Sequence, residues 1–212
     1  MRDLNPQYIS GLLRAGLPGQ RSHLKMIPPG RKLSISAAES EDVRYSSVLL
    51  LVFPHNGQLY TCLTKRSSEM KNHPGQISLP GGRIEEGEKP EVTALREAQE
   101  EVGIDPAEVL LLGRLSELYV QVSRFKIFPF VGWMDHKPEF VVNIAEAEKV
   151  ILFPIQEFFQ GKRLREFPVQ TITGVMNVPC FLYEDEVIWG ATAMILTEFF
   201  DLLNQPSFTT SQ

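Results

Sequence analysis

The sequence predicts an α/β protein of the α+β kind, in which a mixed or mostly antiparallel β-sheet carries helices on its faces. Short apolar segments that end at turn residues are interleaved with helical segments, but without the regular rhythm of a parallel β-α-β fold. The chain has 212 residues, of which 43% are hydrophobic and 22% are charged. This composition is typical of one globular domain and excludes a disordered chain, a collagen and a disulfide-dependent miniprotein.

The elements follow from local patterns along the chain. Apolar residues at helical spacing predict a short helix within residues 6–17, and a Gly-, Pro- and Lys/Arg-rich loop follows at 16–32. The apolar run 46–53 and the segment 59–64 flank a turn, which predicts a hairpin whose first strand is buried on both faces. Further strands are expected at residues 113–122, 125–134, 148–153, 180–183 and 187–189, and further helices at 90–102, 155–160 and 191–203.

The charge balance limits the classes of partner. A net charge of -5 gives no general attraction for nucleic acid or anionic lipid, so an anionic substrate needs local cations or a bound metal. Cys62 and Cys180 stand in separate apolar segments and suggest neither a zinc site nor a disulfide. The sequence contains no signal peptide core and no apolar run of about 18 residues that would form a membrane helix. We therefore expect a cytoplasmic protein with a small-molecule partner and no nucleic-acid or membrane partner, either as a monomer or as a homodimer.

The helix expected from Pro90 carries three carboxylates on one face. Pro90 suits the first helical position, and Gly103 suits the residue just past the end. At about 100° per residue, Glu97, Glu100 and Glu101 fall in one arc opposite a packed apolar face. Like charges at this spacing cost a few tenths of a kcal/mol per pair, so we expect a cation on this face. The alternative is a solvated acidic surface.

The loop before this helix contains two adjacent glycines, Gly81 and Gly82. Glycines allow backbone conformations that other residues avoid, and they let a carbonyl oxygen approach a ligand. Carboxylates and a backbone carbonyl form an all-oxygen site, which suits Mg²⁺ or Mn²⁺ and phosphate chemistry. The histidines are scattered and show no zinc spacing. The sequence therefore predicts a hard divalent cation between this loop and the helix.

The spacing of these residues resembles the Nudix box, G-x5-E-x7-R-E-U-x-E-E-x-G-U, in which U is a bulky aliphatic residue. The match begins at Gly82 and ends at Ile104, and Ala98 at the first U position is its single departure. The resemblance implies an α/β/α sandwich around a mixed β-sheet, and hydrolysis of a nucleoside diphosphate linked to another group. We expect one domain over residues 1–212, divided into an N-terminal helix and loop (1–45), a Nudix core (46–153) and a C-terminal hairpin and helix (154–212).

The Nudix resemblance also implies roles for individual residues. Arg96 would orient two of the carboxylates, and Glu97 or Glu146 would take the proton of the attacking water. Glu148 competes with Glu146 for this role, and either could be a plain surface charge. Metal ligands are expected among the box carboxylates and glycine carbonyls: Glu97, Glu100, Glu101, Gly81 and Gly82. Two further box residues are expected to be structural: Glu88 and Gly103.

Residues 62–82 are similar to a second signature, L-L-T-x-R-S-x-x-L-R-x-H-x-G-Q-V-x-F-P-G-G, of the coenzyme A pyrophosphatase branch of the family. Lys71 replaces an arginine of that signature and cannot offer the planar bidentate fork of arginine. The segment carries five cations, Lys65, Arg66, Lys71, His73 and Arg83, although some of them could pair with surface acids. Substrate contacts are expected from this segment and the box loop: Arg66, Lys71, His73, Gln76, Ser78 and Arg83.

Together, the two resemblances imply Mg²⁺- or Mn²⁺-dependent hydrolysis of coenzyme A or its derivatives to 3′,5′-ADP and (acyl-)4′-phosphopantetheine. A different substrate, ADP-ribose or NADH, is the alternative if the segment before the box has another role. A non-catalytic ligand sensor is less favoured, because such proteins typically lose the box acids and this chain keeps them. Preference among free, acylated and oxidised coenzyme A is left open.

Overall fold

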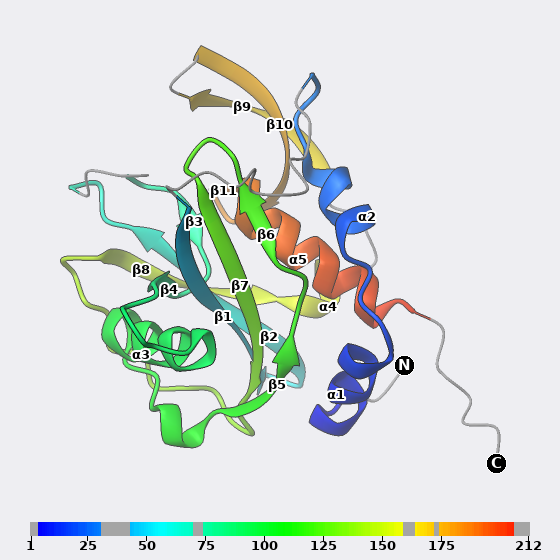
Figure 1. The fold of residues 1–212 in the computed structure, drawn as a ribbon, viewed down its shortest axis with the longest axis vertical. Helices are drawn as coiled ribbons and strands as arrows, with labels where there is room; N and C mark the ends of the chain where they lie inside the picture. The colour runs from blue at the N-terminus through cyan, green and yellow to red at the C-terminus, as the bar shows by residue number, and fades with distance from the viewer. Residues whose placement is uncertain (1–3, 31–42, 70–73, 159–163, 172–173, 206–212) are drawn as a thin grey trace.

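The computed structural model describes residues 4–30, 43–69, 74–158, 164–171 and 174–205 (Figure 1). A β-sheet lies between α3 (Pro90–Val102) on one face and α5 (Gly190–Leu203) on the other. The prediction of a mixed α/β fold with helices on both faces of a sheet is confirmed. No helix in the described ranges is both long enough and apolar enough to cross a bilayer.

The main sheet is built around β1 (Arg44–His55), which pairs antiparallel with β2 (Gln58–Arg66) and parallel with β7 (Phe125–Trp133). The sheet is therefore mixed, as the sequence predicts. Its remaining strands are β3 (Ile77–Ser78), β4 (Gly81–Arg83), β5 (Leu110–Arg114), β6 (Leu118–Val120) and β8 (Ala147–Pro154).

The two faces of β1 contribute to two separate hydrophobic clusters. Because side chains alternate along a strand, Leu50 and Val52 face the α5 side, while Leu49, Leu51 and Phe53 face α3. All of these side chains are fully buried. The expectation of a first strand buried on both faces is confirmed, and it explains why this segment is continuously apolar instead of alternating.

Helix α3 begins and ends where its sequence predicts. Pro90 occupies the first turn, and Gly103 follows the last turn with φ of 75°, a left-handed conformation that favours glycine. Ala98 and Val102 are completely buried against the sheet. The small Ala98 side chain packs without disturbing the opposite face, on which the carboxylates lie.

The N-terminal region differs from its prediction. The first helix is present as α1 (Pro6–Ala15), but the expected loop at 16–32 also contains α2 (Gln20–His23) and a 3₁₀ turn, η1 (Leu24–Met26). Within this region, the side chain of His23 bonds to Glu198 on α5 over 2.9 Å, and both side chains are buried. The two residues are 175 positions apart in the sequence, so no local sequence pattern predicts their contact.

Two further predictions need correction. The strand expected at 113–122 is divided into β5 and β6, because the amide of Ser116 donates to the Glu198 carboxylate instead of to a strand. The C-terminal hairpin is confirmed as β10 (Gly174–Tyr183) and β11 (Glu186–Trp189), but an additional strand, β9 (Leu164–Thr171), extends it to three strands. The side chains of β9 are mostly exposed. Its sequence therefore lacks the alternation of buried and exposed residues that would predict a strand. Two short helices complete the fold, η2 (Pro106–Glu108) and α4 (Ile155–Phe158).

Candidate active site

Arg96 is the cation that lies on the acidic face of α3. Its Nη1 donates to Glu97 Oε1 and to Glu100 Oε2, each over 2.9 Å, and its Nε donates to Glu88 Oε1 over 2.9 Å. The hydrogen bond from Arg96 lowers the pKa of Glu88 to about 2. Arg96 therefore offsets the repulsion between the helix carboxylates and joins the loop before α3 to the helix itself.

Glu101 lies deeper than its neighbours, with 5% of its surface exposed. Burial raises the pKa of this carboxyl group to about 8, while the nearby Arg66 opposes the shift. Among the described residues, Glu101 Oε2 and Arg66 Nε are both buried and have no hydrogen-bond partner. Buried polar atoms are rarely left unpaired, so these two atoms indicate a place where a cation and an anion could bind.

The two glycines of the loop are required by close packing. A Cβ atom on Gly82 would lie 2.2 Å from Glu97 Oε2, and one on Gly81 would lie 2.3 Å from the carbonyl oxygen of Ser47. The Gly81 backbone also hydrogen-bonds to Glu101. The strand that carries these glycines, β4, is thereby pressed between β1 and the acidic face of α3.

Glu146 and Glu148 lie in different surroundings. Glu146 is close enough to Glu97 and Glu101 to contribute, by repulsion, to the raised pKa of each. Its Oε1 accepts a hydrogen bond from Asn143 Nδ2 over 3.2 Å. In contrast, Glu148 Oε1 accepts from the backbone amide of Ser68. The structure therefore brings Glu146, and not Glu148, to the box carboxylates.

The donor set of this region fits a hard divalent cation. Within the described ranges, no three His, Cys, Asp or Glu side chains are gathered as a ready metal site. Glu97 and Glu100 each accept a hydrogen bond from Arg96. The buried, unpaired oxygen of Glu101 and the close approach of Gly82 to Glu97 nevertheless supply the oxygen-rich setting that Mg²⁺ or Mn²⁺ requires.

The segment before the box packs directly beside these carboxylates. Arg66 is positioned by its backbone, which accepts from the amide of Gly75 and donates to the carbonyl of Gln76. Ser78 Oγ lies 3.1 Å from Thr64 Oγ1, so its hydroxyl group already has a protein partner. Lys71 and His73 lie outside the described residues.

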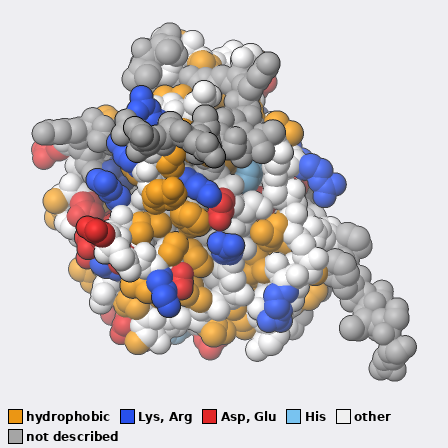
Figure 2. Space-filling model, in the orientation of Figure 1, with side chains coloured by type: hydrophobic (Ala, Val, Ile, Leu, Met, Phe, Trp, Pro, Cys, Tyr) orange, Lys and Arg blue, Asp and Glu red, His pale blue; other side chains and the backbone are white. Residues whose placement is uncertain are grey.

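Lys65, which the sequence groups with the site cations, faces away from it. The Lys65 side chain pairs with Glu186 of β11 over 3.0 Å. The pairing of β2 with β8 has a register shift between Lys65 and Arg66, and the Arg66 side chain lies close enough to Glu101 to lower the pKa of its carboxyl group. In Figure 2, basic side chains are interspersed with acidic and hydrophobic ones on the face in view.

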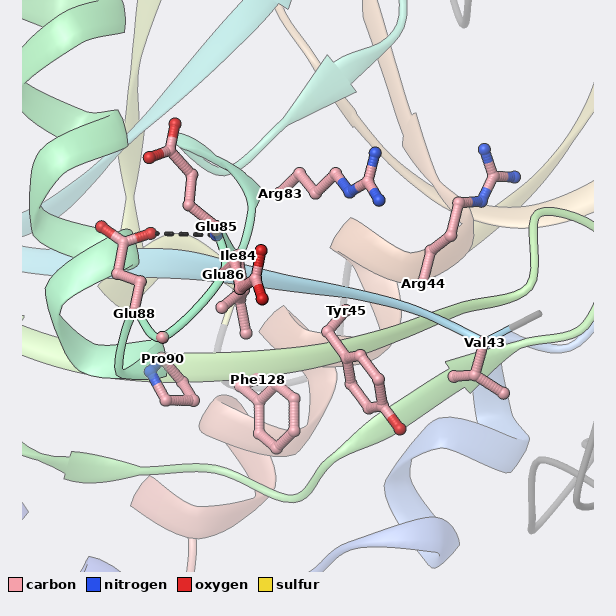
Figure 3. Close-up of a pocket in the computed structure, with 11 residues that line it drawn as sticks. Val43, Arg44, Tyr45, Arg83, Ile84, Glu85, Glu86, Glu88, Pro90 and Phe128 are labelled. Carbon is pink, nitrogen blue, oxygen red and sulfur yellow. Dashed lines mark hydrogen bonds between the residues drawn. The ribbon is translucent and has the colours of Figure 1, made fainter. Parts of the chain in front are cut away.

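A hollow of about 450 Å³ adjoins the box loop (Figure 3). Tyr45 and Phe128 form a stacked pair on one side of it, with ring centroids 6.3 Å apart, and Glu85 and Glu86 line it from the loop. Arg44 and Arg83 also line this hollow. The sequence predicts Arg83 as a site residue but gives no signal for Arg44, Tyr45 or Phe128, because they come together only through strand pairing.

Sequence comparisons identify the family. A model of the NUDIX domain matches residues 43–172. Nudix hydrolase 3 of Caenorhabditis elegans is 30% identical over 83% of this chain and 80% of its own length. The peroxisomal coenzyme A diphosphatase of Mus musculus is 32% identical over 66% of this chain and 59% of its own length. The chain spans about half of two Arabidopsis thaliana relatives, 55% and 52%.

A structural comparison agrees with this fold. The MutT protein from Methanosarcina mazei Go1 has a TM-score of 0.51 and 18% sequence identity, and the match covers 79% of this chain and all of that protein. This likeness concerns the fold alone. The matched domain includes the loop, the helix and the strands that surround the carboxylates described above. The chain belongs to the Nudix family.

Proposed function

We propose that this Nudix hydrolase cleaves the diphosphate bond of coenzyme A or its derivatives, to give 3′,5′-ADP and (acyl-)4′-phosphopantetheine. The observation that carries this proposal is the position of the segment before the box, which brings Arg66 beside Glu101 with its Nε buried and unpaired among the described residues. The same segment resembles the coenzyme A pyrophosphatase signature. The identity of 32% with a coenzyme A diphosphatase supports the same substrate class.

In this proposal, the box residues hold one or more Mg²⁺ or Mn²⁺ ions through Glu97, Glu100 and Glu101, with a carbonyl of Gly81 or Gly82. When bound, such an ion neutralises charge on the diphosphate oxygens and lowers the pKa of a coordinated water. Arg96 is a positioning residue, because it holds Glu97 and Glu100 on one side of α3.

Glu146 takes the proton of the attacking water in this scheme, and Asn143 orients its carboxylate. The water oxygen forms a bond to one phosphorus, the bridging P–O bond breaks, and the bridging oxygen leaves with the other phosphate. Arg66 donates to a diphosphate oxygen and stabilises the charge that develops there. Glu97 is the competing base, since burial raises its pKa and makes it a better proton acceptor than an ordinary carboxylate.

The test is a comparison of kcat/KM for coenzyme A, ADP-ribose and NADH with Mg²⁺ and with Mn²⁺. We expect coenzyme A to be the preferred substrate and Arg66→Gln to reduce its kcat/KM by roughly 10- to 100-fold, as the loss of a charged hydrogen bond does. Arg114→Gln is the matched control, because Arg114 lies on β5 and pairs with Glu117. A preference for ADP-ribose that is indifferent to Arg66→Gln would contradict the proposal.

A further inference from the structure

We infer that Arg44 and Arg83 together bind a second phosphate group, one carried on the ribose of the nucleoside diphosphate substrate. This inference rests on the proposed function, since the diphosphate itself must lie at the box carboxylates. It adds a specificity site that distinguishes a ribose-phosphorylated substrate from its unphosphorylated analogue. Four features of the described residues support it: the placement of the two arginines, their lack of carboxylate partners, the anchoring of Arg44 and the position of Arg83 next to Gly82 on β4.

Strand pairing places the two arginines on the same face of the sheet. Arg83 on β4 is the register partner of Ser46 on β1, and Arg44 lies two residues before Ser46. Paired residues share a face, and diagonal neighbours of this kind have Cα atoms about 7–8 Å apart. Figure 3 shows both arginine side chains on one side of β1, whereas Tyr45 and Phe128 lie on the other.

Neither arginine has an ion-pair partner among the described residues, which makes them unlike Arg96 with its three carboxylates. Arg44 is nonetheless anchored, because its Nη2 donates to the carbonyl of Ser123 and its guanidinium lies 4.5 Å from the centroid of the Phe125 ring. Neither the carbonyl group nor the aromatic ring carries a formal negative charge, so these contacts do not neutralise the positive charge of Arg44. Two like charges at this spacing repel each other, and a phosphate dianion that accepts hydrogen bonds from both would reverse that cost.

The connection to the catalytic region runs through β4. Gly82 and Arg83 are consecutive, so Gly82 faces Glu97 while the Arg83 side chain points to the opposite face. Among the described strands, β4 pairs with β1 alone; its second edge faces α3, where the Arg83 carbonyl accepts from Arg96 Nη2 and the Gly81 backbone bonds to Glu101. A substrate whose diphosphate lies at the box carboxylates near Gly82 can place a ribose substituent beside the Arg83 side chain.

This arrangement bears on the choice of substrate. Coenzyme A carries a phosphomonoester on its ribose, whereas ADP-ribose and NADH do not. Two arginines that both donate to a phosphomonoester would therefore favour coenzyme A through its nucleotide half, independently of the acyl or thiol end. Arginine suits this role because its planar fork can donate two hydrogen bonds to one phosphate.

The test compares kcat/KM for coenzyme A with that for 3′-dephospho-coenzyme A in wild type, Arg44→Gln, Arg83→Gln and the control Arg114→Gln. We expect wild type and Arg114→Gln to favour coenzyme A, and we expect the ratio of the two values to fall at least about tenfold in each of the other variants. A ratio that is unchanged in Arg44→Gln and Arg83→Gln, or a wild type without preference, would overturn the inference.

A binding measurement separates this inference from the proposed function. Calorimetric titration of the wild-type protein with adenosine 3′,5′-bisphosphate and with adenosine 5′-monophosphate needs neither turnover nor a correctly folded variant. We expect the bisphosphate to bind at least about tenfold more tightly. Equal affinities would refute the second phosphate site even if coenzyme A is hydrolysed, whereas tighter bisphosphate binding without any hydrolysis would refute the proposed reaction alone.

Discussion

Replacing Glu101 by Gln should change how the stability of the metal-free protein depends on pH. Glu101 is 95% buried by area, with only 5% of its surface exposed, and its pKa rises from 4.5 to about 8 on folding. The unfolded chain therefore loses this proton near pH 4.5, while the folded protein keeps it until about pH 8. Since the unfolded state binds fewer protons between these values, the group makes the protein less stable as the pH rises through this window.

The size of this effect follows from the same pKa. One pKa unit corresponds to about 1.4 kcal/mol, so the stability lost between pH 4.5 and pH 8 is at most about 5 kcal/mol. A glutamine at this position is nearly the same size but does not ionise. We therefore expect the free energy of unfolding of Glu101→Gln, relative to wild type, to increase by several kcal/mol between pH 5 and pH 8, and we expect the same variant to have lost activity.

Urea unfolding in the presence of EDTA at four pH values from 5 to 8 measures this difference. Glu91→Gln, on the same helix, is the matched control and should leave the pH dependence of wild type unchanged. In parallel samples with Mg²⁺ instead of EDTA, the ion should stabilise wild type more at pH 8 than at pH 6, because a cation favours the ionised carboxylate, and this gain should disappear in Glu101→Gln. A stability difference between variant and wild type that is independent of pH would refute the reasoning.

Three other substitutions test the account. Gly82→Ala places a carbon 2.2 Å from the Glu97 carboxylate, so kcat should fall about 100-fold through misplacement of that side chain, with little change in melting temperature. Glu88→Gln removes a carboxylate whose pKa Arg96 lowers to about 2; its stabilisation is present above pH 4.5 and lost as the pH falls toward 2, so acid unfolding followed by circular dichroism should become shallower. Glu198→Ala leaves the N-terminal region without a buried acceptor and should cost about 3–5 kcal/mol in urea unfolding.

The controls for these substitutions come from the same chain. Gly11→Ala adds a methyl group with nothing within 4 Å in the interior of α1, and it should be stabilising by about 1 kcal/mol. A Gly82→Ala variant with the activity of wild type would show that activity does not depend on the position of the Glu97 carboxylate, and it would contradict this prediction. Glu198→Ala should leave the specific activity of the folded protein unchanged, and a selective loss of activity would contradict its purely structural role.

The parts of the fold that sequence can predict are those with local signals. Helix α3 is bounded by Pro90 and Gly103, and its carboxylate arc follows from helical periodicity alone. The hairpin of β1 and β2 follows from an apolar run and a turn. The pairing of Arg96 with Glu100 follows from their spacing of four residues.

The remaining parts depend on contacts between distant segments. Glu198 bonds to His23 of α2, which is 175 residues away in the sequence, and to the amide of Ser116, at which the expected strand is interrupted and which is 82 residues away. Strands β3 and β4 are too short for a periodic pattern and exist because β1 and β2 pair with them. Arg44 reaches the neighbourhood of Arg83 through the same pairing, so its position could not be read from spacing.

The most direct test of the proposed reaction is the identification of products by mass spectrometry after incubation of coenzyme A with the protein and Mg²⁺ or Mn²⁺ in ¹⁸O-labelled water. We expect 3′,5′-ADP and 4′-phosphopantetheine, with one ¹⁸O atom in one of them, and no products from Glu101→Gln. Intact coenzyme A after incubation with the folded wild-type protein, or cleavage at any bond other than the diphosphate, would contradict the proposal.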